Sequence, residues 1–206
     1  MKEKLPFLEY VRDVYGDEVL SSPKNHPLED YFYEICDCQK CELGKTRQHF
    51  VFGAGNPDAN IMFVGEAPGE QEDKLGLPFV GRSGKLFDKV LEEIGLTRKD
   101  IFIANVLKCR PPKNRDPLPE EIELCENYLH KQIEIIKPQV IVALGRVAAN
   151  TLLRAKNALK DMRGITYIYH NTNLRVTYHP AAILRNMSMY NLLRDDMQEF
   201  VQKYGK

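Results

Sequence analysis

The stretch Ile61-Met62-Phe63-Val64-Gly65-Glu66-Ala67-Pro68-Gly69 is a short apolar run that leads directly into a Gly/Pro-rich turn. A run of this kind, bounded by turn residues, is typical of a buried strand. Three more strands are predicted, at 101–107, 140–144 and 174–178. Helices are predicted between and after them, at about 83–94, 119–136, 145–154 and from about 188 onward. Ser83 is expected to cap the first of these helices.

Strands that alternate with helices predict βαβ units with right-handed crossovers. We therefore expect an α/β fold: a three-layer α/β/α sandwich around a central, mostly parallel, four-stranded sheet. The length of 206 residues suits one such domain, at most with an appendage. We place the domain at residues 29–206 and expect residues 1–28 to be a helical or partly ordered N-terminal extension.

Charge and hydropathy indicate which partners and which cellular compartment to expect. The 29 basic and 29 acidic residues cancel, which argues against a large basic surface but leaves room for a local one. No apolar run approaches the roughly 18 residues that a membrane span needs, and charged residues interrupt the N-terminal apolar stretch, so no secretory signal is predicted. The expectation is a cytoplasmic protein without membrane contact.

Four of the five cysteines fall into two distant pairs, Cys38-x2-Cys41 and Cys109 with Cys125. Four thiolates suit either zinc or a [4Fe–4S] cluster. Zinc ribbons usually have two Cys-x2-Cys knuckles, so the wide spacing of the second pair favours iron–sulfur, with zinc as the alternative. Such a centre would join the N-terminal segment and the 110–118 loop to the core, a structural task. Cys36 is left over and is interpreted as a small buried hydrophobe.

Polar residues stand where three of the predicted strands end: Glu66, Asn105 and His179. Ligands of open parallel sheets gather outside the carboxyl ends of the strands. The sequence therefore predicts that these three side chains form one site.

The same segments resemble the family 4 uracil-DNA glycosylases, the iron–sulfur branch of the uracil-DNA glycosylase superfamily. The matching stretches are GEAPGEQEDKLGLPFVGRSGKLFD (65–88), NVLKCRPPKNRDPLP (105–119), the helix that carries Cys125, VIVALG (140–145) and HPAAILRN (179–186). The resemblance implies a uracil-DNA glycosylase-like fold and a [4Fe–4S] cluster on Cys38, Cys41, Cys109 and Cys125. It also implies a monofunctional DNA repair enzyme that flips uracil out of single- or double-stranded DNA and hydrolyses the N-glycosidic bond. The product is an abasic site, an intermediate of base excision repair.

The resemblance and the residue chemistry together suggest roles in the pocket. The Asn105 amide can pair with O4 and N3–H of uracil, whereas cytosine presents the opposite pattern at those atoms. Phe79 offers a face on which the flipped base can stack. His179 would donate to uracil O2, where negative charge builds as the base departs. Glu66 could orient water or stabilise the sugar cation.

Further residues follow from the family pattern. Gly65 and Ala67 belong to the substrate-binding turn, and the small Ala67 stands where the best-known branch of the superfamily has Asp. Glu72 is expected to screen the C5 position of the base. The DNA-binding residues are expected to be Ser83, Leu184 and Arg185, with Ser83 at a phosphate and the other two as a wedge that fills the gap left by the flipped nucleotide.

Two other classes of function compete with the enzyme. One is a non-catalytic or covalently trapping uracil-DNA binding protein; the trapping relative has a reactive histidine after the second strand, and residues 108–115 contain none. The other is a zinc-stabilised interaction module, which would leave Asn105 and His179 without a shared task. We expect a monomer, and the sequence does not identify any replication or repair partner.

Overall fold

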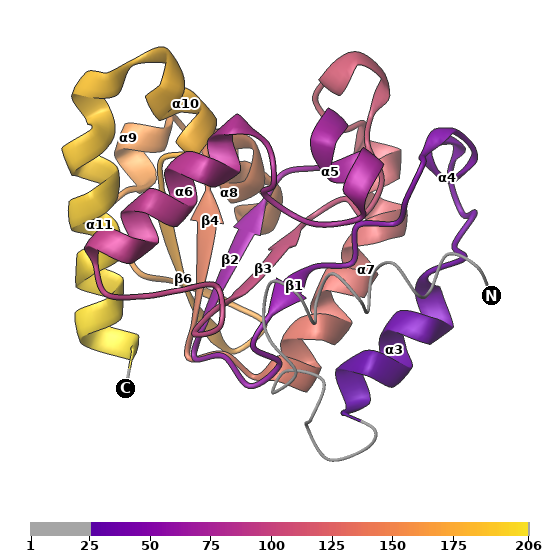
Figure 1. The fold of residues 1–206 in the computed structure, drawn as a ribbon, viewed down its shortest axis with the longest axis horizontal. Helices are drawn as coiled ribbons and strands as arrows, with labels where there is room; N and C mark the ends of the chain where they lie inside the picture. The colour runs from indigo at the N-terminus through magenta and orange to yellow at the C-terminus, as the bar shows by residue number, and fades with distance from the viewer. Residues whose placement is uncertain (1–25, 206) are drawn as a thin grey trace.

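The six-stranded sheet at the centre of the fold contains all four predicted strands (Figure 1). It belongs to a computed structural model that describes residues 26–205, so the predicted N-terminal extension lies outside the described residues except for residues 26–28. The strand order is β1-β3-β2-β4-β6-β5. The four central strands run parallel to one another: β3 (Phe102–Asn105), β2 (Ile61–Gly65), β4 (Val140–Leu144) and β6 (Thr172–Thr177).

The sheet is wider than the four strands expected from the sequence. Two short strands, β1 (Ala54–Gly55) and β5 (Tyr167–Tyr169), pair antiparallel at its two edges. They have two and three residues. Strands of this length contain no apolar run that periodicity could detect, which is why they were missed.

Alternation along the central strands divides the core into two halves, as a three-layer sandwich requires. Met62 and Val64 pack in one buried cluster, whereas Ile61 and Phe63 pack in the other. The first cluster lies under α3 (Pro27–Ile35), α7 (Pro119–Ile136) and α8 (Arg146–Leu153). The second lies under α6 (Arg82–Glu93), α10 (Pro180–Arg185) and α11 (Tyr190–Tyr204). The predicted α/β/α architecture is confirmed.

The helix boundaries differ from expectation at one functional position. Helix α6 begins at Arg82 with Gly81 as its N-cap, and no side chain caps it. The prediction that Ser83 caps this helix is therefore wrong. The remaining elements are short: α4 (Glu42–Thr46), α5 (Glu70–Leu75), α9 (Leu159–Met162) and the 3-10 turns at Pro112–Asn114 and Met187–Met189. Within residues 26–205, none of the helices has the length and apolar character of a membrane span.

The carboxyl ends of the central strands are tied to one another beyond the sheet ladder. After β3, the amides of Val106 and Leu107 donate to the carbonyls of Gly65 and Glu66, both at 3.0 Å. After β4, the amide of Gly145 donates to Thr177 at 2.9 Å. The loops that follow these strands are thus fixed at the carboxyl end of the sheet, where the predicted site should lie.

Candidate active site and cysteine centre

A single cavity of about 630 Å³ opens at the carboxyl ends of the strands and is lined by Glu66, Asn105 and His179 together. Its size falls within the range of ligand-binding pockets, which is about 300–1,000 Å³. Other residues predicted from the sequence also line it: Ala67, Glu72, Phe79, Ser83 and Arg185. The convergence of three loops that are remote in sequence is therefore present in the structure.

Gly65 supports the cavity without lining it. A Cβ atom at this position would lie 2.3 Å from Asn105 Oδ1 and 2.9 Å from the ring of Phe79. Only glycine lets these two side chains approach the end of β2 so closely. Asn105 itself is buried, and its Oδ1 has no hydrogen-bond partner. Because buried polar atoms are normally satisfied, this acceptor is suited to receive a donor from a ligand.

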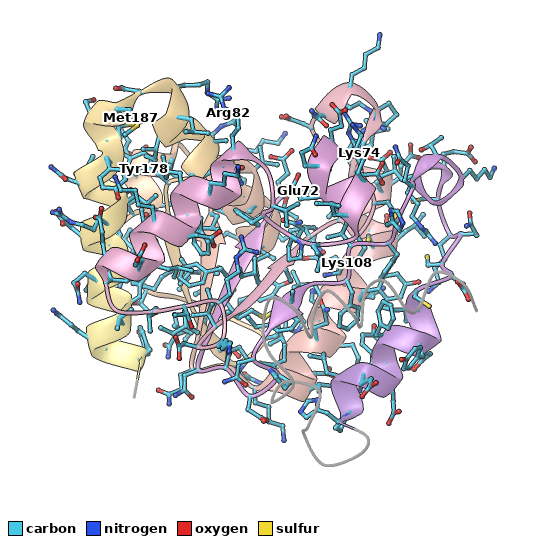
Figure 2. The ribbon with its side chains drawn as sticks, in the orientation of Figure 1. Glu72, Lys74, Arg82, Lys108, Tyr178 and Met187 are labelled. Carbon is cyan, nitrogen blue, oxygen red and sulfur yellow. The ribbon has the colours of Figure 1, made fainter. Side chains whose placement is uncertain are left out.

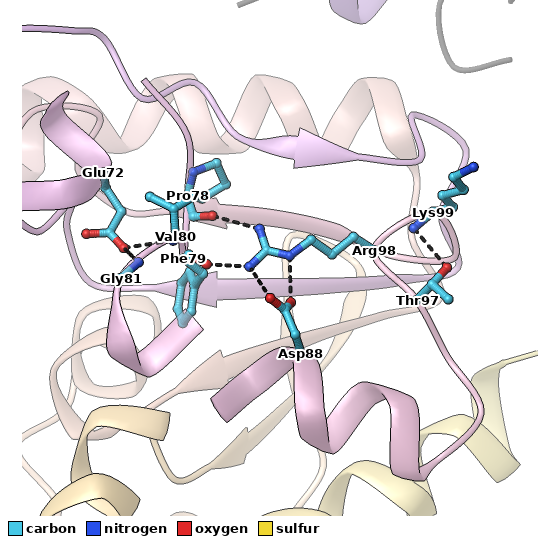
Figure 3. Close-up of polar contacts among 9 residues, drawn as sticks. All are labelled: Glu72, Pro78, Phe79, Val80, Gly81, Asp88, Thr97, Arg98 and Lys99. Atoms are coloured by element: carbon cyan, nitrogen blue, oxygen red, sulfur yellow. Dashed lines mark hydrogen bonds and ion pairs between the residues drawn. The ribbon is translucent and has the colours of Figure 1, made fainter. Parts of the chain in front are cut away.

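Phe79 forms one wall of the cavity in an unusual backbone conformation. Its φ of 55° lies in the left-handed region, which is rare for a bulky side chain and costs on the order of 1–2 kcal/mol. Glu72 holds the following turn, because its Oε1 accepts from the amides of Val80 and Gly81, both at 2.9 Å (Figure 3). The ring centroid of Phe79 lies 5.3 Å from that of His179. Glu72 is thus a buried backbone anchor at the cavity wall, and its screening of a base remains a prediction.

The geometry of His179 fixes its tautomer. Its Nδ1 accepts from the amide of Ala181 at 3.0 Å, so a neutral ring must carry its proton on Nε2. Burial, together with the nearby Arg185 guanidinium, lowers the pKa of His179 to about 4. Near neutral pH the residue is therefore an uncharged N–H donor.

Glu66 has the opposite perturbation. Burial and, to a smaller extent, the carboxylate of Asp116 raise its pKa to about 7, and the guanidinium of Arg146 opposes both. A carboxyl group with this pKa exists in both protonation states near neutral pH, as suits an acid–base role.

Sequence reasoning missed a second set of cavity-lining residues: Pro111, Asn114, Arg115, Asp116, Leu144, Gly145, Arg146, Val147, Leu159, Ala181 and Ala182. Arg146 lies two positions after the end of β4, so the strand-end argument that found Glu66 could have found it as well. No sequence signal marks Asp116, which reaches the cavity because of the path of the loop between β3 and α7.

The predicted wedge residues are placed unequally. Arg185 is exposed and lines the cavity, whereas Leu184 is half-buried in α10 and does not line it. The next large apolar side chain along the chain that is strongly exposed is Met187, at 57%. Figure 2 shows Met187 on the same side of the molecule as Arg82 at the start of α6. No pattern in the sequence singled out Met187.

The four predicted ligands Cys38, Cys41, Cys109 and Cys125 line one cavity on the α7 side of the molecule. Among residues 26–205, no three His, Cys, Asp or Glu side chains converge closely enough to hold a single metal ion. The sulfur atoms thus surround a space without meeting at a point. Burial raises the pKa of the Cys109 thiol to about 11 and of the Cys125 thiol to about 12.

Hydrogen-bond donors are directed at three of these sulfur atoms. The hydroxyl of Tyr128 donates to Cys38 Sγ at 3.1 Å, and Arg47 donates to Cys109 Sγ at 3.4 Å. The backbone amide of Lys108 donates to Cys125 Sγ at 3.3 Å. Such donors commonly orient and tune thiolate ligands, so the donor set fits a metal centre.

Comparison with known proteins agrees with this geometry. The family model of the uracil DNA glycosylase superfamily matches residues 52–204, and the chain belongs to this superfamily. It is 44% identical over 187 residues to the type-4 uracil-DNA glycosylase of Archaeoglobus fulgidus, covering 87% of this chain and 94% of the relative. It is 46% identical over 175 residues to the type-4 enzyme of Thermotoga maritima, covering 82% and 91%. With the type-5 uracil-DNA glycosylase of Thermus thermophilus, 34% identity extends over 118 residues, which cover 50% and 53%. Within the superfamily the chain is a member of the type-4 group.

Proposed function

We propose that this protein is a uracil-DNA glycosylase that removes uracil from DNA by hydrolysing the N-glycosidic bond. The proposal is supported by the type-4 relatives, which match over most of their length, and by the cavity that Glu66, Asn105 and His179 line together. A base stacked in a duplex cannot enter such a cavity, so the enzyme must extrude it, at a cost of a few kcal/mol. The abasic product is the first intermediate of base excision repair.

The unpartnered Oδ1 of Asn105 is the observation that carries the choice of base. Uracil brings N3–H to this acceptor and O4 to the amide nitrogen. Cytosine would bring a lone pair at N3 and an amino group, leaving both sides unpaired. Sites that are built to hydrogen-bond one pattern reject its absence strongly, by as much as about 10⁴–10⁵-fold.

His179 and Glu66 would divide the chemistry of bond cleavage. As a neutral donor, Nε2–H of His179 can stabilise the charge that develops on O2 of the departing uracil. The ionised carboxylate of Glu66 can orient the attacking water or stabilise the sugar cation. Phe79 supplies the stacking face, and Ser83, Arg185 and Leu184 are proposed to hold the DNA around the extruded nucleotide.

An oligonucleotide assay tests this function. We expect alkali-labile sites at uracil in single- and double-stranded DNA, and parallel substrates with hypoxanthine, xanthine and a thymine mismatch define the range. Asn105→Ala and His179→Ala should slow excision at least 100-fold without weakening binding to undamaged DNA. Asn173→Ala is the matched control, because this asparagine lies at the opposite end of a parallel strand, where its amide donates to the Gln139 carbonyl at 3.1 Å. Stable binding of uracil-DNA without an abasic product would instead indicate a capturing protein.

We also propose that Cys38, Cys41, Cys109 and Cys125 hold a [4Fe–4S] cluster. The support is a four-thiol cavity with donors directed at the sulfurs, in a chain whose relatives are type-4 enzymes. Anaerobically isolated protein should contain iron and sulfide and absorb visible light. The Cys109→Ser variant should lack the iron, the sulfide and the absorbance. Cys36→Ser is the control and should keep them. Stoichiometric zinc in a colourless protein would refute the cluster.

The finer expectations, a monomer that acts in the cytoplasm with residues 29–206 as its catalytic domain, stay predictions. Light scattering of the full-length protein tests the first of them.

A further inference from the structure

Arg98 is a largely buried arginine outside the cavity that makes four hydrogen bonds to one turn and one helix (Figure 3). It lies in the loop between α6 and β3, and its side chain is 12% exposed. Its Nη1 donates to the carbonyl of Pro78 at 3.0 Å, and its Nη2 donates to the carbonyl of Phe79. Its Nε donates to Asp88 Oδ1 at 2.6 Å, so that α6 orients the guanidinium.

These contacts complete the restraint of the peptide group between Phe79 and Val80. Its carbonyl accepts from Arg98, and its amide donates to Glu72 at 2.9 Å. Both ends of one peptide unit are therefore fixed by charged side chains from opposite directions. This peptide unit directly follows the left-handed φ of Phe79, so the two anchors act where an unrestrained chain would relax.

Helix α6 closes the same turn from a third side. A Cβ atom at Gly84 would lie only 1.7 Å from the carbonyl oxygen of Phe79, so the first turn of the helix packs directly against that carbonyl. Asp88, one turn later on α6, holds Arg98. Neither Asp88 nor Arg98 lines the active-site cavity; both border a separate depression on the outer surface. Any influence they have on a bound base must pass through the turn.

We propose that Arg98, oriented by Asp88, is a positioning residue that holds the ring of Phe79 at the angle required to stack on the extruded base. This inference rests on the proposed stacking role of Phe79. Arg98 is suited to this task because its rigid, forked guanidinium can bond two consecutive carbonyls and a carboxylate at once. The Asp88 side chain is 47% exposed, so as an isolated ion pair the two residues would stabilise the fold only weakly.

Substitution of each partner tests the proposal. We expect Arg98→Gln to lower the single-turnover rate of uracil excision about tenfold and Asp88→Asn somewhat less, since small misplacements of a positioned group have effects of this size. Arg98→Lys should fall between wild type and Arg98→Gln, because a lysine offers a point charge without the fork. Affinity for undamaged DNA should not change.

Glu199→Gln provides the matched control. Glu199 is 52% exposed and pairs with a buried arginine, Arg175, at 2.8 and 2.9 Å, but this pair joins α11 to β6, and neither residue lines the cavity. It should lower the melting temperature about as much as Asp88→Asn while keeping the wild-type excision rate. If Asp88→Asn and Arg98→Gln slow excision no more than Glu199→Gln does, the proposal is wrong.

A double-mutant cycle separates this proposal from the role of Phe79 itself. If the Arg98–Asp88 pair (the clamp) acts through the ring of Phe79, Arg98→Gln should add almost nothing to the rate loss caused by Phe79→Ala. Fully additive losses would refute the clamp. Wild-type excision by Phe79→Ala would refute the stacking role, whereas a slow Phe79→Ala beside an unaffected Asp88→Asn would refute the clamp alone. Asp88→Asn carries the cycle if Arg98→Gln does not fold.

Discussion

The raised pKa of Glu66 predicts that the rate of uracil excision depends on pH near neutrality, and that this carboxyl group alone causes the dependence. With a pKa of about 7, roughly one molecule in eleven carries the carboxylate at pH 6 and roughly ten in eleven at pH 8. If the carboxylate is the active form, the single-turnover excision rate should rise about tenfold over this interval. The assay uses enzyme in excess over a uracil oligonucleotide at constant ionic strength.

His179, the proposed donor to uracil O2, does not change its charge in this pH range. Because the pKa of His179 is lowered to about 4, the ring stays neutral and keeps its Nε2–H throughout. Glu66→Gln should therefore be slow at every pH and show no rise between pH 6 and pH 8. A wild-type rate that is flat over this interval, or a Glu66→Gln variant that keeps the rise, would refute the reasoning.

Two neighbouring charges should move the midpoint of the rise in opposite directions. Asp116→Asn removes a negative charge and should shift the midpoint to lower pH, whereas Arg146→Gln should shift it to higher pH. Both side chains belong to exposed residues, so the shifts should shrink as salt is added.

Glu66 should also make the stability of the fold fall as pH rises, whereas it makes the excision rate increase. The pKa of Glu66 is higher in the folded than in the unfolded protein, so the folded state binds more protons between about pH 4.5 and pH 7. The contribution of Glu66 is complete below this interval and is lost as pH rises through 7. The melting temperature of Glu66→Gln should therefore exceed that of wild type by more at pH 8 than at pH 5. His179 titrates in both proteins and cancels from the difference.

Three further outcomes are expected elsewhere. Gly65→Ala should abolish excision, to below about 1% of wild type, while leaving the fold intact by circular dichroism, because its Cβ would displace Asn105 and the ring of Phe79. Gln132→Leu should lower the free energy of unfolding by about 2–4 kcal/mol in urea titrations, since it leaves the buried Lys108 Nζ without its 2.6 Å acceptor. Removing the proposed cluster with a chelator should lower the melting temperature, because a bound metal centre contributes to folding; an unchanged value would show that the centre is not structural.

The sequence predicted which strand-end residues line the candidate site, but it did not predict the contacts that shape the walls of the cavity. The sequence alone could place Asn105 and His179 in one site, because the carboxyl ends of parallel strands lie at the same end of the sheet. The orientation of Glu72 could not, since EQEDKL has no apolar face that would reveal helix α5 or show that this acid is buried against backbone amides. Arg98 was also missed, because its partners lie 10 to 20 residues earlier in the chain and only the tertiary fold aligns them.

The cysteine centre and the cavity are joined by one short segment. Asn105 ends β3 in the cavity, and Cys109 lies four positions further along at the centre. Between them, Lys108 is fully buried. Its Nζ donates hydrogen bonds to the Asn105 carbonyl at 2.9 Å and to Oε1 of Gln132 on α7 at 2.6 Å.

The loop that continues from Cys109 to α7 contributes Asn114, Arg115 and Asp116 to the cavity, yet it contains only one 3-10 turn of its own. Such a loop needs external anchors to hold a functional side chain within about 0.5 Å. The bidentate contact of Arg115 with Glu121 anchors its far end, at 2.9 and 2.6 Å. A metal centre at Cys109 would anchor its near end. Its value for uracil excision would then be mechanical, which requires no change of redox state during the reaction.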